Sequence, residues 1–317
     1  MPVLQLDGLT TNYRTVRGWV KAAEDVSFEV EKGEALGLVG ESGCGKTTVA
    51  LSILKILPSG ARIRHGKIIF DGRDLVPLSD SEMRKIRWKG ISIVFQGAMN
   101  ALNPVFKVGD QIVEAIRLHE DVSKGDAMRR AESLLELVGV EPSRVNNYPH
   151  EFSGGMRQRA LIAMALASNP QLLIADEPGT ALDVIVQAQV LKLMRSLKEK
   201  LGLSMIMISH DLSIVAEVCE KVAIMYAGHL VEYGSIEAIF KEPLHPYTQG
   251  LLGAFPGIKG ERRKLTSIPG QPPDLLAPPA ACRFHPRCPY VMDICKKEKP
   301  LLEKAGSGDH YVACYLY

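Results

Sequence analysis

A glycine-rich segment near the N-terminus has the residue types and spacing of a phosphate-binding loop. Residues 40–47, Gly-Glu-Ser-Gly-Cys-Gly-Lys-Thr, fit the pattern G-x-x-x-x-G-K-[ST]. Glycines let the backbone approach phosphate, and the N–H groups of the loop and of the following helix point at the anion. In this pattern Lys46 reaches the β- and γ-phosphates, and the hydroxyl of Thr47 binds Mg²⁺. The phosphate-binding residues expected here are Gly40, Ser42, Gly43, Cys44, Gly45, Lys46, Thr47 and Thr48.

Two adjacent carboxylates follow a short apolar run. Residues 172–175 are apolar, as in a buried strand, and Asp176 and Glu177 come directly after them. Ligands of parallel α/β sheets bind at the carboxyl ends of the strands. We expect Asp176 to bind Mg²⁺, directly or through water, and Glu177 to act as the general base on the attacking water. The competing interpretation is a solvated acidic turn, which the phosphate loop upstream makes the weaker one.

Four of the six cysteines lie close to the C-terminus, at Cys282, Cys288, Cys295 and Cys314. Four thiolates suit an iron–sulfur cluster or zinc. Structural zinc sites favour ligand pairs separated by about two to four residues, and the sequence has no Cys-x-x-Cys, so the spacing leans weakly towards iron–sulfur. His285 and His310 are alternative ligands, and four unrelated thiols are the remaining interpretation.

The elements that must position these residues alternate along the chain. Residues 4–30 contain short β-rich runs, and residues 105–140 are expected to be mostly helical. Apolar runs predict strands at residues 35–39, 66–71, 91–95, 172–175, 204–208 and 222–225, and the remaining patterns predict helices at residues 47–57, 156–168, 184–201 and 212–219. Strands alternating with helices predict an α/β fold with a parallel sheet.

Length and composition set limits on the function. The 317 residues suggest two domains, or one large domain with an extension. Lys and Arg number 38 against 36 Asp and Glu, and a net charge of +2 argues against a nucleic-acid coat or a polybasic membrane binder. No apolar run approaches the ~18 residues of a membrane span, and no secretory signal is visible. We therefore expect a cytoplasmic protein with reduced cysteines.

Residues 152–159, Phe-Ser-Gly-Gly-Met-Arg-Gln-Arg, place a hydroxyl and two glycine amides at an expected helix N-terminus. This segment resembles the signature motif of ABC-type ATPases, usually written LSGGQ, with departures at Phe152 and Met156. Other family motifs follow in the expected order: Gln96 matches the Q-loop glutamine, residues 181–183 the D-loop, and His210 the switch histidine. Tyr13 is the best match for the adenine-stacking aromatic, with Trp19 as its rival. Residues 97–98 and Gly179 depart from the family pattern.

The resemblance implies a P-loop NTPase fold with an ABC-type β subdomain and a helical subdomain at about residues 100–168. It implies a head-to-tail dimer in which ATP lies between the phosphate loop of one subunit and Ser153, Gly154 and Gly155 of the other. The implied Mg²⁺ ligands are Thr47, Gln96 and Asp176, and the implied catalytic residues are Glu177, His210 and Gln96. ATP and Mg²⁺ are the implied cofactors.

The end of the chain is similar to the C-terminal extension of the dipeptide/oligopeptide importer ATPases. The similarity rests on residues 245–248 (His-Pro-Tyr-Thr), 268–270 (Ile-Pro-Gly) and 287–289 (Arg-Cys-Pro). In those relatives four cysteines bind a [4Fe–4S] cluster, so the resemblance implies the same role for Cys282, Cys288, Cys295 and Cys314. It implies an ATPase domain at residues 1–255, and at residues 256–317 a proline-rich linker with an irregular four-cysteine extension.

The resemblance also implies a function: ATP hydrolysis that powers import of di- or oligopeptides. The implied partners are two membrane permease subunits and a second ATPase subunit, identical or homologous, with an extracellular substrate-binding protein as an indirect partner. The chain would be peripheral, on the cytoplasmic face of the cell membrane. One alternative is the same role with nickel or oligosaccharide as cargo. A remote alternative is a soluble ABC ATPase acting on nucleic acid or ribosomes, but the near-neutral charge argues against a nucleic-acid partner.

Overall fold

The computed structural model describes residues 1–97, 101–180, 182–253, 268–305 and 308–317. The chain forms two compact units, each built from segments that are distant in the sequence. Unit 1 comprises Met1–Val3, Val30–Ala35 and Pro77–Ile208, and unit 2 comprises Leu4–Glu29, Leu36–Val76 and Ser209–Tyr317. In the described part of the chain, no helix combines the length and hydropathy that crossing a bilayer requires.

The parallel strands of unit 1 place the predicted acidic pair. They are β6 (Ile91–Val94), β7 (Leu172–Asp176) and β8 (Ser204–Ser209), with β7 paired to both neighbours. Every residue of β7 and β8 is buried, which explains why both read as near-continuous apolar runs. Because these three strands are parallel neighbours, their carboxyl ends lie at the same edge of the sheet.

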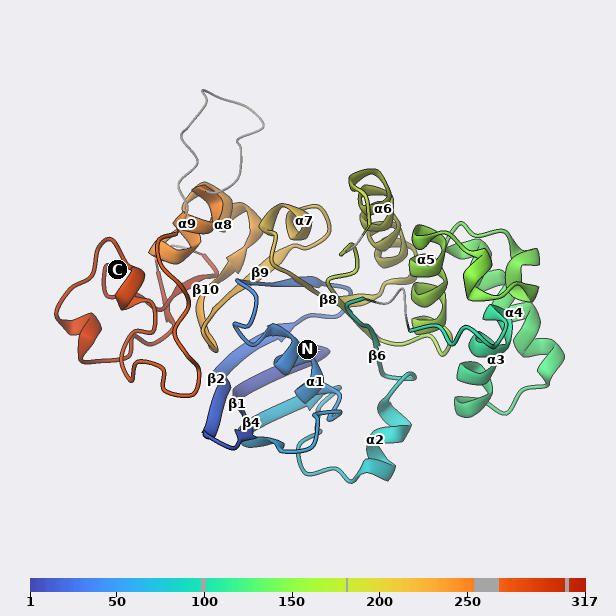
Figure 1. Ribbon diagram of the computed structural model, residues 1–317, viewed down its shortest axis with the longest axis horizontal. Helices are drawn as coiled ribbons and strands as arrows, with labels where there is room; N and C mark the ends of the chain where they lie inside the picture. The colour runs from blue at the N-terminus through green and yellow to red at the C-terminus, as the bar shows by residue number, and fades with distance from the viewer. Residues whose placement is uncertain (98–100, 181, 254–267, 306–307) are drawn as a thin grey trace. The chain divides into compact units, whose positions relative to one another are not determined.

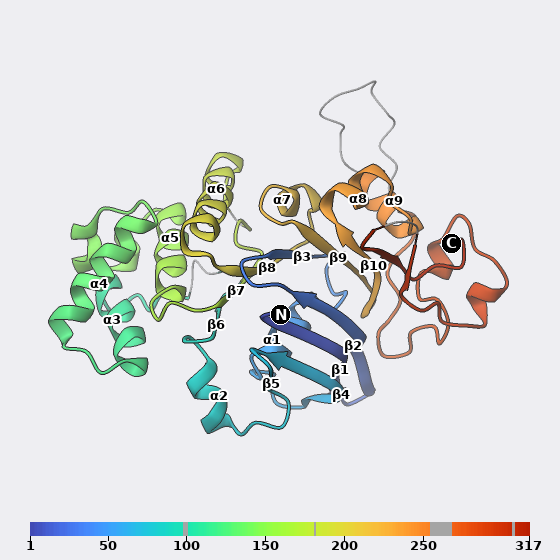
Figure 2. The same ribbon diagram turned by 180° about the vertical axis from the view of Figure 1, so that it is seen from behind.

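Helices make up the rest of unit 1. They are α2 (Asp80–Ile86), α3 (Val108–His119), α4 (Lys124–Leu137), α5 (Gly154–Ala165) and α6 (Val184–Leu201), with the 3₁₀ turns η2 (Pro142–Asn146) and η3 (Pro149–Glu151). Helices α3, α4 and α5 lie side by side (Figure 2). Their shared core includes Ile112 and Ile116 from α3 and Leu135 from α4, all fully buried.

The N-terminal strands of unit 2 form an antiparallel sheet in the order β2-β1-β4-β5. The strands are β1 (Leu4–Thr15), β2 (Gly18–Val30), β4 (Ala61–Phe70) and β5 (Arg73–Asp74). Helix α1 (Lys46–Ile53) lies beside this sheet (Figure 1). The buried hydroxyls of Thr11 and Ser52 join β1 to α1 at 2.9 Å.

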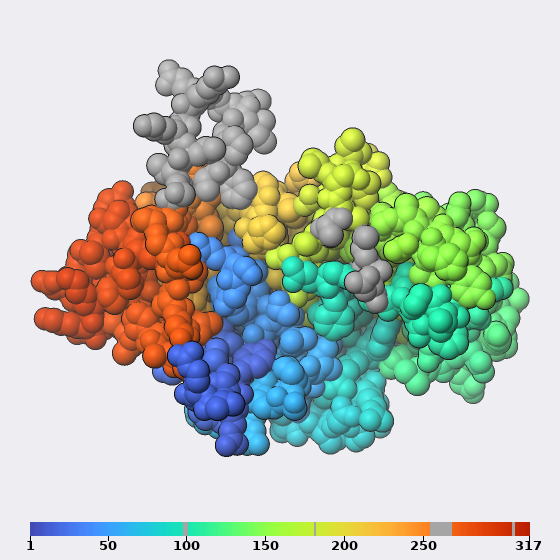
Figure 3. Space-filling view, viewed as in Figure 1, coloured from blue at the N-terminus to red at the C-terminus, as the bar shows by residue number. Residues whose placement is uncertain are grey.

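The second sheet of unit 2 combines strands from both ends of the chain. β3 (Ala35–Val39) is parallel to β9 (Lys221–Tyr226), and β10 (His229–Ser235), β12 (His310–Val312) and β11 (Glu303–Lys304) follow as antiparallel neighbours. Helices α7 (Leu212–Ala216), α8 (Ile236–Lys241) and α9 (Pro246–Gly253) belong to the same unit. In Figure 3 the orange and red C-terminal residues pack beside the blue N-terminal strands.

A buried carboxylate ties the C-terminal residues to this sheet. Glu232 of β10 has no solvent exposure. Its two oxygens accept hydrogen bonds from the backbone N–H groups of Leu244 at 2.8 Å and His245 at 2.9 Å. His310 Nε2, from β12, lies 2.8 Å from the Oε1 atom of Glu232. The carboxylate therefore links β10, the start of α9 and β12.

The α/β fold predicted from the sequence is confirmed, and the strands expected near residues 35–39, 91–95, 172–175, 204–208 and 222–225 are all present. Residues 105–140 form two helices because Ser123 caps α4, its hydroxyl accepting a hydrogen bond from Asp126 N–H. Helix α1 ends at Ile53, earlier than the predicted residue 57. The extension, expected to be irregular, contributes β11 and β12 and the 3₁₀ turns η4 (His285–Arg287) and η5 (Ile294–Lys296). Part of the predicted linker, residues 256–267, lies outside the described residues.

Close packing of β3 against α7 leads to a stability prediction. A Cβ atom at Gly37 would lie 1.9 Å from Val215 Cγ1. The substitution Gly37→Ala should therefore lower the free energy of unfolding by about 1–3 kcal/mol, the usual cost of overpacking. Urea unfolding measures the change. At Gly125 of α4 the nearest atom would be 3.8 Å away, so Gly125→Ala is the control and should not destabilise the protein. Equal stability of both variants would contradict the packing.

Candidate functional site

The phosphate loop joins β3 to α1, and neighbouring backbone surrounds it. A Cβ atom at Gly45 would lie 2.0 Å from the carbonyl oxygen of Ala22, and one at Gly40 would lie 2.1 Å from that of Met225. Gly45 also has a φ of +108°, which L-residues with side chains rarely adopt. The glycines of the sequence pattern are therefore required by the close approach of the loop to β2 and β9.

Lys46 lies inside this loop. Its side chain is buried, and its Nζ donates hydrogen bonds to the carbonyl oxygens of Gly40 at 2.6 Å and Glu41 at 3.0 Å. Burial of the neighbouring Cys44 raises the pKa of its thiol, so Cys44 is a small neutral residue. Helix α1 begins at Lys46, so its first N–H groups face the loop together with the ammonium group. This is the arrangement that binds a phosphate chain.

Tyr13 is the aromatic residue that the structure brings beside the phosphate loop. Its hydroxyl lies 3.1 Å from the hydroxyl of Thr48 in α1. Trp19, the rival candidate, is paired with Arg64, whose guanidinium carbon lies 4.6 Å from the indole centroid. The aromatic face of Trp19 is thus already engaged by a cation, whereas Tyr13 lies next to the first turn of α1.

In unit 1 the structure assembles a second group around Glu177. Gln96 Nε2 and Thr180 Oγ1 both donate hydrogen bonds to Glu177 Oε2, at 2.7 and 2.8 Å. The N–H of Glu177 donates to the Ile208 carbonyl oxygen at 2.9 Å, which joins the ends of β7 and β8. Glu177 has a φ of +48°, an uncommon value for a residue with a side chain. The carboxylate is therefore held in one orientation by its side chain and its backbone.

Asp176 precedes Glu177 and ends β7. Its side chain is 1% exposed, and its backbone is paired with Ile208 across the β7–β8 ladder. A carboxylate is seldom buried to this degree unless it is paired or binds a cation. Its position at the carboxyl end of a parallel strand agrees with the role predicted for it.

The Ser-Gly-Gly segment begins α5, as predicted. Ser153 is the N-cap, and its hydroxyl accepts a hydrogen bond from Met156 N–H at 3.3 Å. A Cβ atom at Gly155 would lie 2.5 Å from Val186 Cγ1, so this glycine allows α5 to approach α6. Phe152, where the signature pattern has leucine, is 3% exposed, so this position holds a buried apolar side chain.

The turn after β8 carries His210. Asp211 caps α7 by accepting a hydrogen bond from Ser213 N–H at 2.8 Å, and its own N–H donates to Ser209 Oγ at 2.9 Å. These bonds fix the backbone on both sides of His210, whose side chain is exposed. In the predicted D-loop, Ala181 lies outside the described residues, and Asp183 caps α6 through Val186 N–H at 2.9 Å.

The predicted nucleotide residues thus fall into two groups. Unit 2 contains the phosphate loop, Tyr13 and His210. Unit 1 contains Gln96, Asp176, Glu177 and the residues Ser153, Gly154 and Gly155. The structure directly joins Gln96 to Glu177 and Tyr13 to Thr48.

The four C-terminal cysteines line one small cavity in unit 2, together with Phe284 and Tyr290. Cys295 is buried and the other three are half-buried. Burial raises the pKa of the Cys282 thiol to about 11, and it also raises the pKa values of Cys288 and Cys314. Among the residues with described positions, no three or more His, Cys, Asp or Glu side chains are grouped closely enough to hold a single metal ion.

Of the two histidines proposed as alternative ligands, His285 lines this cavity and His310 does not. His285 Nδ1 lies 2.9 Å from the carbonyl oxygen of Cys282, and His310 Nε2 is engaged with Glu232. Cys219, which does not line this cavity, is buried. The cavity therefore brings the four cysteines together with His245 and His285.

Comparison with known proteins agrees with this geometry. The ABC transporter family profile matches residues 23–180, and the profile of the oligopeptide/dipeptide transporter C-terminal region matches residues 231–295. The oligopeptide transport ATP-binding protein OppD of Bacillus subtilis is 49% identical over 99% of this chain and 88% of its own length. The dipeptide transport ATP-binding protein DppD of the same organism is 48% identical, covering 99% of this chain and 94% of the relative.

The chain belongs to the family of peptide ABC transporter ATPases. Among solved structures, a dimeric post-hydrolysis state of the ATP-binding cassette MJ0796, bound to ADP and Pi, matches with a TM-score of 0.66 at 26% identity. That match covers 74% of this chain and 98% of the other. The P-loop NTPase fold predicted from the sequence is thus confirmed, and the chain is an ABC-type ATPase.

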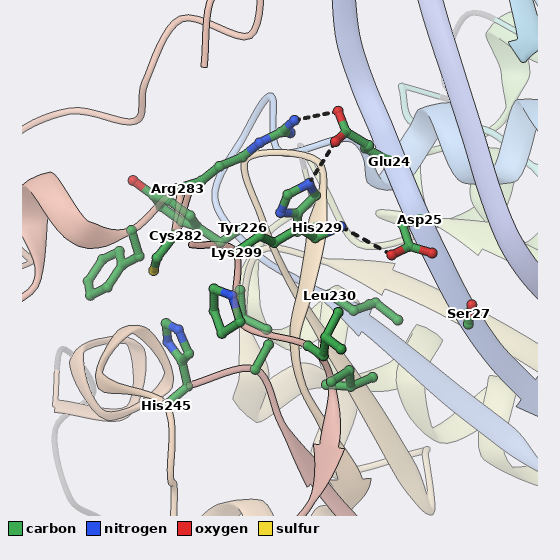
Figure 4. Close-up of a pocket in the computed structure, with 16 residues that line it drawn as sticks. Glu24, Asp25, Ser27, Tyr226, His229, Leu230, His245, Cys282, Arg283 and Lys299 are labelled. Carbon is green, nitrogen blue, oxygen red and sulfur yellow. Dashed lines mark hydrogen bonds and ion pairs between the residues drawn. The ribbon is translucent and has the colours of Figure 1, made fainter. Parts of the chain in front are cut away.

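Sequence reasoning missed the residues that attach the extension of this peptide transporter ATPase to its β subdomain. A cavity of about 270 Å³ lies where they meet (Figure 4). Arg283 donates to Glu24 Oε2 of β2 at 2.7 Å and to the carbonyl oxygen of Ala227, and Lys299 donates to Asp25 at 3.1 Å. The imidazole of His229, whose Nε2 lies 3.6 Å from Glu24 Oε1, and the nearby guanidinium of Arg283 lower the pKa of Glu24 to about 2. In the sequence, the basic residues between the C-terminal cysteines were the feature that could have indicated this attachment.

The geometry of Glu177 leads to a kinetic prediction. Glu177→Gln would remove the predicted general base but keep a side chain of the same size, so ATP should still bind while turnover falls by about 100-fold or more. Steady-state phosphate release and retention of labelled ATP on the protein measure the two effects. Glu199→Gln, which changes an exposed carboxylate of α6, is the control and should leave turnover unchanged. Undiminished hydrolysis by Glu177→Gln would assign the base elsewhere.

Proposed function

We propose that this ATPase hydrolyses ATP with Mg²⁺ and thereby powers the import of di- or oligopeptides through a membrane permease. The main observation is the carboxylate of Glu177, which Gln96 and Thr180 hold at the carboxyl end of β7 in a chain that also carries a formed phosphate loop. The peptide cargo is supported by the relatives that match over nearly the entire chain, which are named as oligopeptide and dipeptide transport proteins.

In this proposal each residue has a defined task. Lys46 and the loop N–H groups bind the phosphates, and Tyr13 stacks on the adenine. Thr47, Gln96 and Asp176 hold Mg²⁺, Glu177 activates water, and His210 contacts the γ-phosphate. The burial of Asp176 and the hydrogen bond from Gln96 to Glu177 support these roles. Hydrolysis needs no covalent intermediate, because positioning and charge stabilisation carry most phosphoryl transfer.

The proposed assembly contains two ATPase subunits, identical or homologous. Ser153, Gly154 and Gly155 of one subunit cover the ATP on the phosphate loop of the other, and the dimeric form of the structurally similar cassette supports this pairing. Two permease subunits and, indirectly, an extracellular substrate-binding protein complete the importer. The chain then acts as a peripheral protein on the cytoplasmic face of the membrane, with residues 1–255 as its ATPase domain and residues 256–317 as its extension.

Transport of labelled peptide tests this function. Membrane vesicles with the permease, the second ATPase subunit and the binding protein should take up labelled di- or oligopeptide when supplied with ATP. Glu177→Gln should reduce the uptake to background, because closure without hydrolysis gives at most one cycle. Labelled nickel and oligosaccharides, the alternative cargoes, serve as parallel substrates. Uptake of either one in place of peptide would replace the proposed cargo.

We propose that Cys282, Cys288, Cys295 and Cys314 hold a [4Fe–4S] cluster. The support is that all four thiols line one cavity with apolar walls, where a cluster would cross-link a segment with little core of its own. A cluster places its four cysteine ligands around several iron atoms, so it does not require the tight grouping of a single-ion site. The cluster would have a structural role, since no substrate-binding residue lines this cavity.

Anaerobic purification tests the cluster. The protein should be brown and contain about four iron and four sulfide per chain, the composition of this cluster type. Cys295→Ser removes one ligand and should lower the iron content and the thermal midpoint together, whereas Cys219→Ser, in the core away from this cavity, should retain the iron. A colourless protein with stoichiometric zinc would overturn this assignment.

A further inference from the structure

The C-terminal extension reaches the phosphate loop through one arginine. Glu41 is the second residue of the loop, and both of its carboxylate oxygens accept hydrogen bonds from Arg287. The distances are 2.7 Å from Nη1 to Oε2 and 3.0 Å from Nη2 to Oε1. This is the bidentate geometry that a planar guanidinium makes with a carboxylate, and it fixes orientation as well as distance.

Arg287 is itself held rigidly. Its side chain is 5% exposed. Its Nε donates to the carbonyl oxygen of Pro269 at 2.8 Å, and its Nη1 lies 3.3 Å from the hydroxyl of Tyr226. Burial alone would lower the pKa of Arg287, but the hydrogen bonds to Glu41 and Tyr226 raise it above its ordinary value. The guanidinium is therefore a fixed positive charge beside the loop.

The backbone of Glu41 is fixed at the same place. Its N–H donates to the hydroxyl of Tyr247 at 2.8 Å, and its carbonyl oxygen accepts from Lys46 at 3.0 Å. Tyr247, from α9, is completely buried, and its ring packs against Tyr226 and Phe284. One loop residue is thus held at its side chain by the extension, at its N–H by α9 and at its carbonyl by the phosphate-binding lysine.

We propose that Arg287 is a positioning residue of the nucleotide site, through which the extension sets the affinity of the phosphate loop for ATP. The proposal rests on the role of the phosphate loop given above. It has two physical parts. The bidentate contact holds the loop backbone in the shape that presents its N–H groups, and the guanidinium neutralises a carboxylate that would otherwise repel the triphosphate.

Arg287 also connects the phosphate loop to the four-thiol cavity, through its neighbour in the sequence. Cys288, which lines the four-thiol cavity, directly follows Arg287. The 3₁₀ turn η4 ends at Arg287, so the guanidinium and the thiol extend from adjacent backbone positions. A change in the cavity that moves this turn also moves the contact to Glu41. The extension is therefore coupled to nucleotide affinity without contacting the nucleotide.

Nucleotide binding by matched variants tests the proposal. Arg287→Met should weaken binding of a fluorescent ATP analogue by about tenfold or more, because the half-buried carboxylate of Glu41 loses its partner beside the phosphates, with a smaller effect on kcat. Arg287→Lys keeps the charge without the bidentate contact and should give an intermediate loss. Glu41→Gln in the Arg287→Met background removes the unpaired carboxylate and should restore much of the affinity.

Lys299→Met provides the matched control. Lys299 also joins the extension to β2, through Asp25, but it makes no contact with the phosphate loop. This variant should bind the analogue within about twofold of the parent, because exposed ion pairs contribute little. Thermal unfolding of each variant reports whether the extension stays folded.

Two results would overturn the proposal. One is unchanged affinity in folded Arg287→Met and Arg287→Lys variants. The other is an equal loss in Lys299→Met, which would show that attachment of the extension in general, and not this contact, matters. Lys46→Ala separates the proposal from its premise: if that variant still binds the analogue normally, the phosphate-loop assignment fails, whatever the Arg287 variants do.

Discussion

At Gly40 and Gly45 the backbone of the phosphate loop lies so close to neighbouring strands that no side chain fits there. The loop touches the Ala22 carbonyl of β2 at Gly45 and the Met225 carbonyl of β9 at Gly40. It is therefore shaped by elements around it rather than by its own sequence. Those elements are held in turn by the second sheet of unit 2 and by the C-terminal extension. A local motif of eight residues thus depends on segments from both ends of the chain.

The carboxylate of Glu177 is constrained in a different way. Its position comes from a strand end, its backbone is held by a hydrogen bond to Ile208, and its side chain accepts from two donors. The general base proposed here must meet water in one orientation, and each of these contacts removes a degree of freedom from it. The order around this carboxylate in unit 1 is thus achieved by hydrogen bonds, whereas order in the loop of unit 2 is achieved by close packing.

Features carried by neighbouring residues could be predicted from the sequence. The motif of the phosphate loop, the Asp176–Glu177 pair and the cap at Ser153 could be recognised from contiguous residues, although the shape of the loop itself depends on β2 and β9. The contact of Arg287 with Glu41 joins residues separated by most of the chain, and neither residue type marks it. The three-residue strand β12 is too short to show an alternating pattern, so its pairing with β10 was also missed. The sequence already favoured Tyr13 over Trp19, and the contact of Arg64 with the indole ring supports that preference.

Glu232 has a consequence for how its surroundings can unfold. This buried carboxylate is satisfied by the N–H groups of Leu244 and His245 and by His310. Opening any one of these segments alone would leave a buried charge without a partner, which costs more than the hydrogen bond itself is worth. Strand β10, the start of α9 and β12 therefore form one cooperative unit that opens together rather than by fraying of its separate parts.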